Sequence, residues 1–252
     1  MTRPTPRSAD LDPDLVLRAY AMGVFPMAEH RDEDSVFWVE PRQRAILPLD
    51  GFHLSRSLRR TIISDRFRVT ADAAFEQVIA LCAESAPDRP DTWINPSIEK
   101  VFGELHRRGF AHSVEVWEGE RLAGGLYGLA LGRAFFGESM VSRARDASKV
   151  AIAALVARLR VGEFELLDCQ FMTDHLASLG AVEVPRETYL SMLSDALGEG
   201  AAGLASGAAG VSADFGALDA FAAPPDPLAP APLTSSPPVS GKVIAQLLTQ
   251  TS

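Results

Sequence analysis

Three consecutive side chains at the end of an apolar run could take part in chemistry. Asp168, Cys169 and Gln170 follow two leucines in the stretch LLDCQ. Because side chains alternate along a strand, we expect Asp168 and Gln170 on one face and Cys169 on the other. A carboxyl group directly after an apolar run can have a shifted pKa, which makes Asp168 a candidate acid or base. A plainer interpretation, a polar strand end that caps the next helix, stays open.

The thiol of Cys169 is a weaker candidate. A nucleophilic cysteine needs a nearby base or cation that lowers its pKa, and no His or Lys is adjacent in the sequence. We therefore interpret Cys169 as a buried structural residue. The only other cysteine in the sequence, Cys82, is far from Cys169 along the chain, so the two fit neither a disulfide framework nor a CxxC metal site.

A second acid, Glu138, lies among Phe135, Phe136 and Met140 in the stretch FFGESM. It has two interpretations: a carboxylate that faces a ligand, or the partner of Lys149 or a nearby Arg in a salt bridge. The glycines of the preceding stretch GGLYGLALG do not lead into a helix, so they do not predict a phosphate-binding loop. We expect them to let a ligand or another backbone approach a strand closely.

The charge distribution excludes some classes of partner. The net charge of −9 argues against indiscriminate binding to nucleic acid, which requires a positive field. A local exception runs from residue 42 to residue 68, where seven arginines face two aspartates and give a balance of +5. These arginines are Arg42, Arg44, Arg56, Arg59, Arg60, Arg66 and Arg68. The five histidines have no spacing typical of metal ligands, so we predict no metal.

The elements that would position these residues alternate between helix and strand. Apolar spacing predicts helices within 12–26, 53–64, 72–84, 96–109, 147–163, 174–180 and 187–197, and extended pieces within 36–50. Strands are predicted at 112–118, 121–131 and 134–141, as a meander, and at 164–170 and 181–186. The fold class is therefore α/β with a mostly antiparallel sheet. Three arginines of the second helix, Arg56, Arg59 and Arg60, share a surface.

Three regions are expected along the chain: a small N-terminal domain at 11–43, a main domain at 44–198 and a tail at 199–252. The tail is rich in Ala, Gly, Pro and Ser, has Lys242 as its single cation, and is predicted to be disordered. The exception is GKVIAQLLTQ, which could form one or two helical turns. No signal segment and no run of about 20 apolar residues is present, so we expect a cytoplasmic protein.

Motifs in the right order make the chain resemble the leucyl/phenylalanyl-tRNA–protein transferase family, from about Leu15 to about Leu197. They are AYAMGVFPM, FHLSRSLRR, TWI, HSVEVWEGERLAGGLYG, FFGESM, ASK, DCQ and HLASLGAVEVPRETYL. The resemblance implies a small N-terminal domain followed by an acetyltransferase-like (GNAT) domain. It also implies transfer of Leu or Phe, and less readily Met, from aminoacyl-tRNA to proteins with N-terminal Arg or Lys. Such transfer marks those proteins for N-degron proteolysis, and the resemblance implies neither a cofactor nor a metal.

The family's functional residues can be carried over by position. Asp168 and Gln170 match the catalytic acid and amide. The wall of the aminoacyl pocket corresponds to Leu126, Phe135, Glu138, Met140, Leu155, Leu159 and Leu167. Tyr20 and Trp93 match aromatic residues near the terminal adenosine of the tRNA, and Arg56 and Arg60 match basic residues along the acceptor stem. Met27 stands where the family often has Trp, and the tail at 199–252 has no counterpart.

Two other functions remain as alternatives. An acetyltransferase that uses acetyl-CoA needs two small residues in a pyrophosphate-binding loop, but the corresponding stretch, Arg143 to Ser148, reads RARDAS and has neither of them at the required position. A non-catalytic module that binds tRNA or N-degrons would be expected to lose Asp168 or Gln170, and both are present. We expect a monomer that does not bind membranes.

Overall fold

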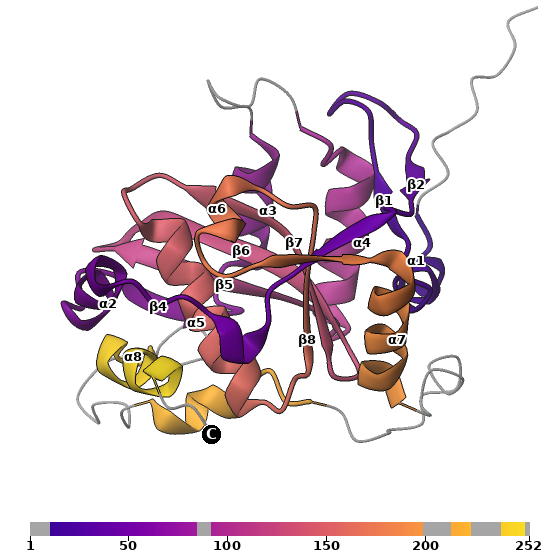
Figure 1. Cartoon of the computed structure of the whole chain (residues 1–252). Helices are drawn as coiled ribbons and strands as arrows, with labels where there is room; N and C mark the ends of the chain where they lie inside the picture. Colours follow the sequence, from indigo (N-terminus) through magenta and orange to yellow (C-terminus); the bar gives the residue numbers. More distant parts are fainter. Residues whose placement is uncertain (1–10, 85–91, 199–212, 223–237, 250–252) are drawn as a thin grey trace, which may run out of the picture.

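The structure, a computed structural model, describes residues 11–84, 92–198, 213–222 and 238–249. A seven-stranded sheet crosses the centre of the molecule, and helices cover both of its faces (Figure 1). A separate two-stranded sheet lies near the N-terminus. The α/β class predicted from the sequence is confirmed. No helix in the described residues is long and apolar enough to span a bilayer.

The elements follow the predicted order closely. The helices are α1 (Pro13–Ala21), α2 (Arg56–Ile63), α3 (Phe75–Ala83), α4 (Pro96–Arg107), α5 (Ala147–Val161), α6 (Asp174–Ala177), α7 (Arg186–Leu197) and α8 (Gly241–Thr249), with short 3₁₀ helices η1 (Leu49–Gly51) and η3 (Ala217–Phe221). The strands are β1 (Phe25–Met27), β2 (Phe37–Val39), β3 (Gln43–Ile46), β4 (Arg68–Ala71), β5 (Ala111–Glu118), β6 (Arg121–Leu131), β7 (Ala134–Ser142), β8 (Leu166–Gln170) and β9 (Val182–Pro185). β1 and β4 are short strands that the sequence did not predict.

The large sheet is mixed, which corrects the prediction of a mostly antiparallel sheet. Its strand order is β4-β5-β6-β7-β8-β3-β9, and β7 pairs with β8 in parallel. The reason is the connection, because α5 carries the chain from the end of β7 back to the start of β8, and such a crossover joins parallel strands. The pattern of strand, helix and strand was visible in the sequence, but its consequence for strand direction was missed.

Two apolar cores lie on opposite faces of the sheet. On one face, α5 is buried along nearly its whole length and packs with α2, η3 and α8. On the other face, α1, α3, α4 and α7 enclose an aromatic cluster in which Tyr20 packs edge-on against Phe102 and Phe136. The N-terminal residues are tied to this second core, because Arg31 donates hydrogen bonds to the Ile94 carbonyl and the Glu99 carboxylate.

The C-terminal region corrects the prediction of a disordered tail in part, and it confirms the helical turns predicted in GKVIAQLLTQ. Residues 213–222 and 238–249 form η3 and α8, and Phe215, Leu218, Ile244 and Leu248 are buried in the core around α5. The rest of the predicted tail lies outside the described residues. The composition of the tail obscured η3 and the docking of both segments, because a few well-spaced apolar residues are enough to dock a short helix on an existing core.

Candidate active site

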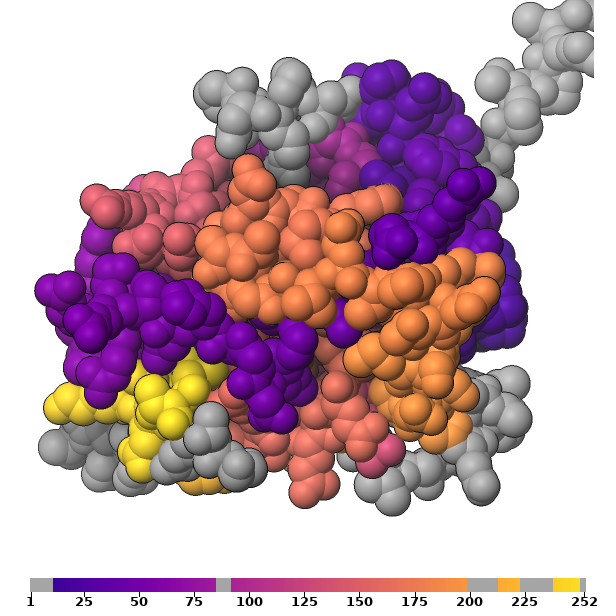
Figure 2. Space-filling view, in the orientation of Figure 1, coloured from indigo at the N-terminus to yellow at the C-terminus, as the bar shows by residue number. Residues whose placement is uncertain are grey.

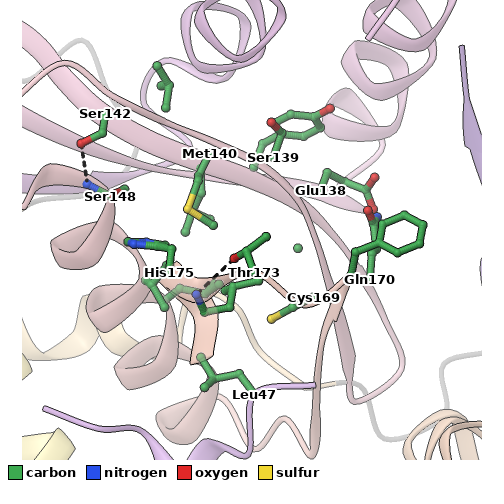
Figure 3. Close-up of a pocket in the computed structure, with 18 of the residues that line it drawn as sticks. Leu47, Glu138, Ser139, Met140, Ser142, Ser148, Cys169, Gln170, Thr173 and His175 are labelled. Atoms are coloured by element: carbon green, nitrogen blue, oxygen red, sulfur yellow. Dashed lines mark hydrogen bonds between the residues drawn. The ribbon is translucent and has the colours of Figure 1, made fainter. Parts of the chain in front are cut away.

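A pocket opens where β7 and β8 separate. Their parallel pairing ends at Phe136 opposite Asp168, and the residues that follow on each strand line a cavity of about 760 Å³. This volume lies within the usual range for small-molecule sites. Glu138 and Gln170 lie side by side at one end of the pocket, and Met140 and His175 lie toward the other (Figure 3).

Most of the predicted pocket residues line this cavity. They are Leu126, Glu138, Met140, Leu155 and Leu167. Phe135 and Leu159 do not line it, although both are fully buried in the same core. The ring of Phe135 packs on Gly128 so closely that a β-carbon on Gly128 would lie 2.4 Å from the ring. The same ring stacks on Phe215. Phe135 therefore belongs to the layer behind the pocket wall.

Asp168 is completely buried and points away from the pocket. Its carboxylate accepts hydrogen bonds from the Arg44 guanidinium, the closest at 2.6 Å, and from the Tyr189 hydroxyl at 2.9 Å. It also accepts the backbone N–H of Gln170 at 2.7 Å. The Arg44 guanidinium lies between the rings of Tyr189 and Phe25, 4.6 Å from each centroid. Asp168 is thus held by three residues and positions the end of β8.

Gln170 departs from the predicted strand alternation. Its φ of 63° is in the left-handed region, which non-glycine residues seldom adopt, and β3 pairs with β8 through a bulge at this point. As a result Gln170 lines the pocket together with Cys169, while Asp168 faces the opposite side. The Gln170 Nε2 atom is buried and has no hydrogen-bond partner among the described residues. A strained residue with an unpaired donor is typical of a functional site.

Glu138 faces Gln170 from the neighbouring strand, and it is 7% exposed. Its carboxyl oxygens make no ion pair and no hydrogen bond of regular geometry within the described part of the chain, although the Tyr20 hydroxyl and the Gln170 amide lie close to them. The alternative of a salt bridge to Lys149 or a nearby Arg is therefore wrong. Burial raises the pKa of Glu138 to about 8, and the Tyr20 hydroxyl and the Gln170 amide offset that shift only in part. A carboxyl group in this state can hold a proton at neutral pH and release it to a basic partner.

Cys169 lines the pocket but is not activated. Burial raises the pKa of its thiol, and the nearby Asp168 carboxylate adds to the increase. The neutral thiol is therefore strongly favoured, as the sequence indicated. Cys169 contributes shape and apolar surface to the pocket wall.

Of the residues predicted to surround the adenosine, only one lies at the pocket. Trp93 is half-buried and lines the pocket. Tyr20 is fully buried in the aromatic core, which is incompatible with stacking on a base from outside. Met27 is half-buried on β1, opposite Phe37, and does not line the pocket. Phe171, which the sequence motifs did not indicate as a site residue, is 46% exposed at the pocket.

The predicted basic patch is smaller than the sequence suggested. Arg56, Arg59 and Arg60 are exposed on α2 and form no ion pair in the described regions. Arg66 pairs with Glu118, and Arg44 is buried against Asp168. A run of charged residues in the sequence does not reveal which of them the strands will turn inward.

Three residues at or behind the site were missed. Arg44 and Tyr189 hold Asp168, and His175 lines the pocket with a buried Nε2 that has no partner among the described residues. Burial lowers the pKa of His175, and the Lys149 charge lowers it further. The only available signal was the position of Tyr189 in the motif RETYL. Nothing in the sequence around Arg44 indicates that a residue 124 positions away is its partner.

Comparison with known proteins gives a consistent result. Residues 46–194 match the family described as leucyl/phenylalanyl-tRNA protein transferase, and residues 9–42 match the N-terminal domain of that family. A protein from Rhizorhabdus wittichii named leucyl/phenylalanyl-tRNA–protein transferase is 61% identical over 250 residues, which cover 96% of this chain and 99% of that protein. Proteins of the same name from Zymomonas mobilis and Novosphingobium aromaticivorans are 63% and 50% identical, over 74% and 96% of this chain and 70% and 97% of their own lengths.

The extent of these matches also bears on the C-terminal region. An alignment that covers 96% of the chain must include most of residues 199–252, so the expectation that this region has no counterpart among such proteins is wrong. The motifs quoted for the resemblance all precede residue 198, which is why they did not reveal it. With both family matches in place over most of its length, the chain belongs to the leucyl/phenylalanyl-tRNA protein transferase family and is an aminoacyltransferase.

Proposed function

We propose that the protein transfers Leu or Phe, and less readily Met, from aminoacyl-tRNA to the α-amino group of proteins that begin with Arg or Lys. The observation that supports this best is that two buried polar side chains, Glu138 and Gln170, face each other at one end of the pocket, and neither makes a hydrogen bond of regular geometry within the described residues. The acceptor class and the role of the product in N-degron proteolysis are carried over from the family.

The pocket lining favours particular aminoacyl groups. Leu126, Met140, Leu155 and Leu167 present flexible apolar surface, which stabilises an apolar side chain and penalises a charged one. Side chains branched at Cβ would place a methyl group next to the reacting ester. Discrimination between groups that differ by one methylene amounts to about 1–3 kcal/mol, so the preference for Leu and Phe should be graded.

The reaction needs little chemistry from the protein. The acceptor α-amine attacks the ester carbonyl of the aminoacyl-tRNA, the C–N bond forms, and the bond to the terminal ribose oxygen breaks. The amine proton finally goes to that ribose oxygen, so atoms and charges balance. Because the ester is already activated, the main tasks are to orient the two reactants and to move one proton.

Each polar residue has a distinct task in this proposal. Gln170 Nε2 donates a hydrogen bond to the oxygen of the ester carbonyl as its negative charge develops. Glu138, whose pKa burial raises to about 8, relays the proton: its ionised form takes the proton from the attacking amine, and the resulting carboxyl group gives it to the ribose oxygen. Asp168 does not line the pocket, and it acts as a positioning residue that holds the backbone N–H of Gln170.

The tRNA is bound by two regions in the proposal. Arg56 and Arg60 on α2, joined by Arg59, contact phosphates of the acceptor stem. Trp93 and Phe171 offer aromatic surface for the terminal adenosine at the pocket. Met27 stays a weaker candidate for that contact.

The test is a transfer assay with leucyl-tRNA and a peptide that begins with Arg, followed by mass spectrometry of the peptide. The proposal predicts a gain of one leucyl residue at the peptide N-terminus, and no gain on a matched peptide that begins with Ala. Acetylation of the peptide with acetyl-CoA would favour the acetyltransferase alternative. Binding of charged tRNA and peptide without any product would favour the non-catalytic alternative.

A further inference from the structure

The C-terminal helix α8 lies directly against α2 (Figures 1 and 2). The backbone N–H of Gly241, the first residue of α8, donates a 2.7 Å hydrogen bond to Oδ1 of Asp65, just beyond the end of α2. Gly241 also packs so closely on the Ile62 carbonyl that a β-carbon would lie 1.9 Å from that oxygen. The contact is therefore specific to glycine at this position.

The apolar side of α8 covers the apolar side of α2. Ile244 and Leu248 are buried in the same core cluster as Leu58 and Ile62 of α2. A helix of eight residues such as α2 is not stable by itself in water and depends on packing for its position. Without α8, part of the surface that holds α2 would be missing.

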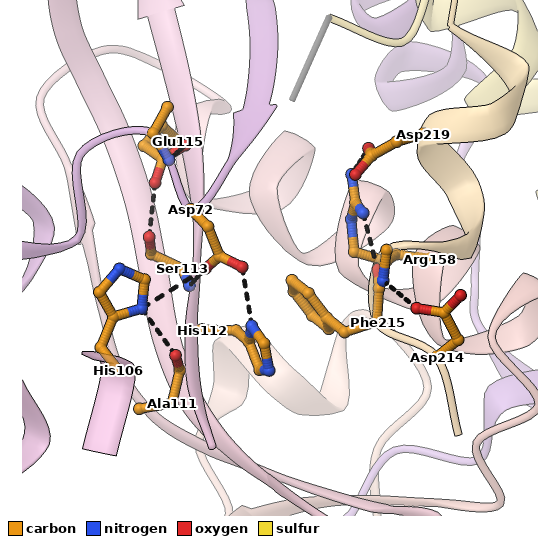
Figure 4. A network of polar contacts seen from close by, with 12 residues as sticks. Asp72, His106, Ala111, His112, Ser113, Glu115, Arg158, Asp214, Phe215 and Asp219 are labelled. Atoms are coloured by element: carbon orange, nitrogen blue, oxygen red, sulfur yellow. Dashed lines mark hydrogen bonds and ion pairs between the residues drawn. The ribbon is translucent and has the colours of Figure 1, made fainter. Parts of the chain in front are cut away.

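The C-terminal region is itself fastened to the central helix α5. Arg160 donates a hydrogen bond to the Leu247 carbonyl of α8 at 2.9 Å, and two more to the Leu49 carbonyl of η1. Arg158 bonds to the Phe215 carbonyl at 2.7 Å and to the Asp219 carboxylate at 2.6 Å (Figure 4). The Phe215 ring stacks on His112, whose ring nitrogen bonds to Asp72. These contacts connect α8 and η3 to α5 and, through His112, to β5 of the sheet.

The opposite side of α2 carries Arg56, Arg59 and Arg60, which are exposed and form no ion pair among the described residues. We propose that α8 is a positioning element for tRNA binding, which holds α2 so that these arginines meet the phosphates of the acceptor stem. The inference rests on the proposed function of α2. Because phosphate contacts depend on the register of several charges, a displaced α2 would weaken tRNA binding without changing the pocket.

The test compares two donors of the same leucyl group: leucyl-tRNA, which has the acceptor stem, and leucyl-adenosine, which has no phosphate. Gly241→Val introduces the clash with Ile62, and Leu248→Ala removes buried contact in case the first variant does not fold. Gln246→Ala, at an exposed position of the same helix, is the control. With leucyl-tRNA, we expect KM to rise about tenfold in the first two variants and kcat to change little. With leucyl-adenosine, all variants should match the wild type.

The outcomes are distinguishable. Equal losses with both donors would mean that α8 acts on the pocket, and unchanged kinetics with both would mean that α8 does not act on the reaction; either result overturns the inference. If the wild type transferred from neither donor, the proposed function would fail instead. The inference would then be judged by the affinity for uncharged tRNA and its salt dependence, which Gly241→Val and Leu248→Ala should both reduce and Gln246→Ala should not.

Discussion

Two acidic side chains at the ends of adjacent strands are both buried, but their surroundings are opposite. Asp168 on β8 is completely buried and accepts hydrogen bonds from Arg44, Tyr189 and the backbone of Gln170. Glu138 on β7 is 7% exposed, faces the pocket and has no partner among the described residues. The Asp168 carboxylate forms its hydrogen bonds within the protein, while the Glu138 carboxyl group has hydrogen-bonding capacity left for a ligand.

The difference shows that burial alone does not identify a reactive acid. The Asp168 carboxylate accepts hydrogen bonds from a cation and from neutral donors, and these contacts make it part of the scaffold. A buried carboxyl group with no such partner has a raised pKa and can exchange a proton near neutral pH. Burial raises the pKa of Glu138 to about 8 in this way. The proposal therefore treats Asp168 as a positioning residue and Glu138 as the candidate for proton transfer.

The largest expected effect is at the partner of Asp168. Arg44→Met should lower the free energy of unfolding by about 3–5 kcal/mol, because it leaves a buried carboxylate without its cation. Thermal or urea unfolding measures this change. The double variant Arg44→Met with Asp168→Asn should recover part of the loss, since the isolated charge is gone. A single variant as stable as the wild type would show that Asp168 does not depend on Arg44.

The next effect concerns Gln170, whose backbone N–H bonds to Asp168 and whose side-chain amide faces Glu138. Gln170→Ala should lower kcat about 100-fold for both leucyl and phenylalanyl donors, because the donor to the developing oxyanion is removed. The melting temperature should change little, since Nε2 has no partner in the described residues. Gln246→Ala makes the same substitution at an exposed site and should have wild-type kinetics. A raised KM with unchanged kcat would assign Gln170 to substrate binding instead.

Glu138 should make the stability of the protein depend on pH. Its pKa rises from 4.5 to about 8 on folding because of burial, so the folded state binds the extra proton between these values. The favourable contribution of the neutral carboxyl is complete below pH 4.5 and is lost as the pH rises toward about 8. Relative to the wild type, Glu138→Gln should therefore gain a few degrees in melting temperature as the pH increases through this window. A difference that is constant with pH would contradict the raised pKa.

The smallest effect is expected at Tyr189. Tyr189→Phe removes one of the donors to Asp168 but keeps the Arg44 ion pair and the ring that packs on it. The loss should be about 1–2 kcal/mol in the free energy of unfolding, typical of a hydrogen bond to a charged group. Comparison with Arg44→Met under the same conditions would rank the two partners. A loss as large as that of Arg44→Met would mean that the hydroxyl is as important as the cation.

Local patterns in the sequence were enough to predict most elements. Helical spacing located α4 and α5, and the glycine turns located the meander of β5, β6 and β7. The parallel pairing of β7 with β8 and the docking of α8 depend on contacts between residues distant in the sequence, which a local pattern does not contain. This is also why the segment around Leu248 was predicted as helical turns but not as part of the core.

The site was predicted only in part, because it too depends on contacts between residues that are distant in the sequence. The sequence motifs predicted that Glu138 and Gln170 belong to the site, and both residues line the pocket. Alternation along an ideal strand failed at Gln170 because the left-handed backbone and the bulge against β3 rotate its side chain. Arg44 was counted in a surface patch, since nothing local distinguishes an arginine that will be buried by a carboxylate far along the chain.

The division of tasks between the two acids can be tested most directly by infrared titration of their carboxyl groups in the intact protein. The C=O band of a protonated buried carboxyl group should be present at neutral pH and disappear as the pH rises through about 8. That band should be absent from Glu138→Gln and retained in Asp168→Asn. If the band persisted in Glu138→Gln and were lost in Asp168→Asn, Asp168 would be the proton carrier, and the account given for Glu138 would be wrong.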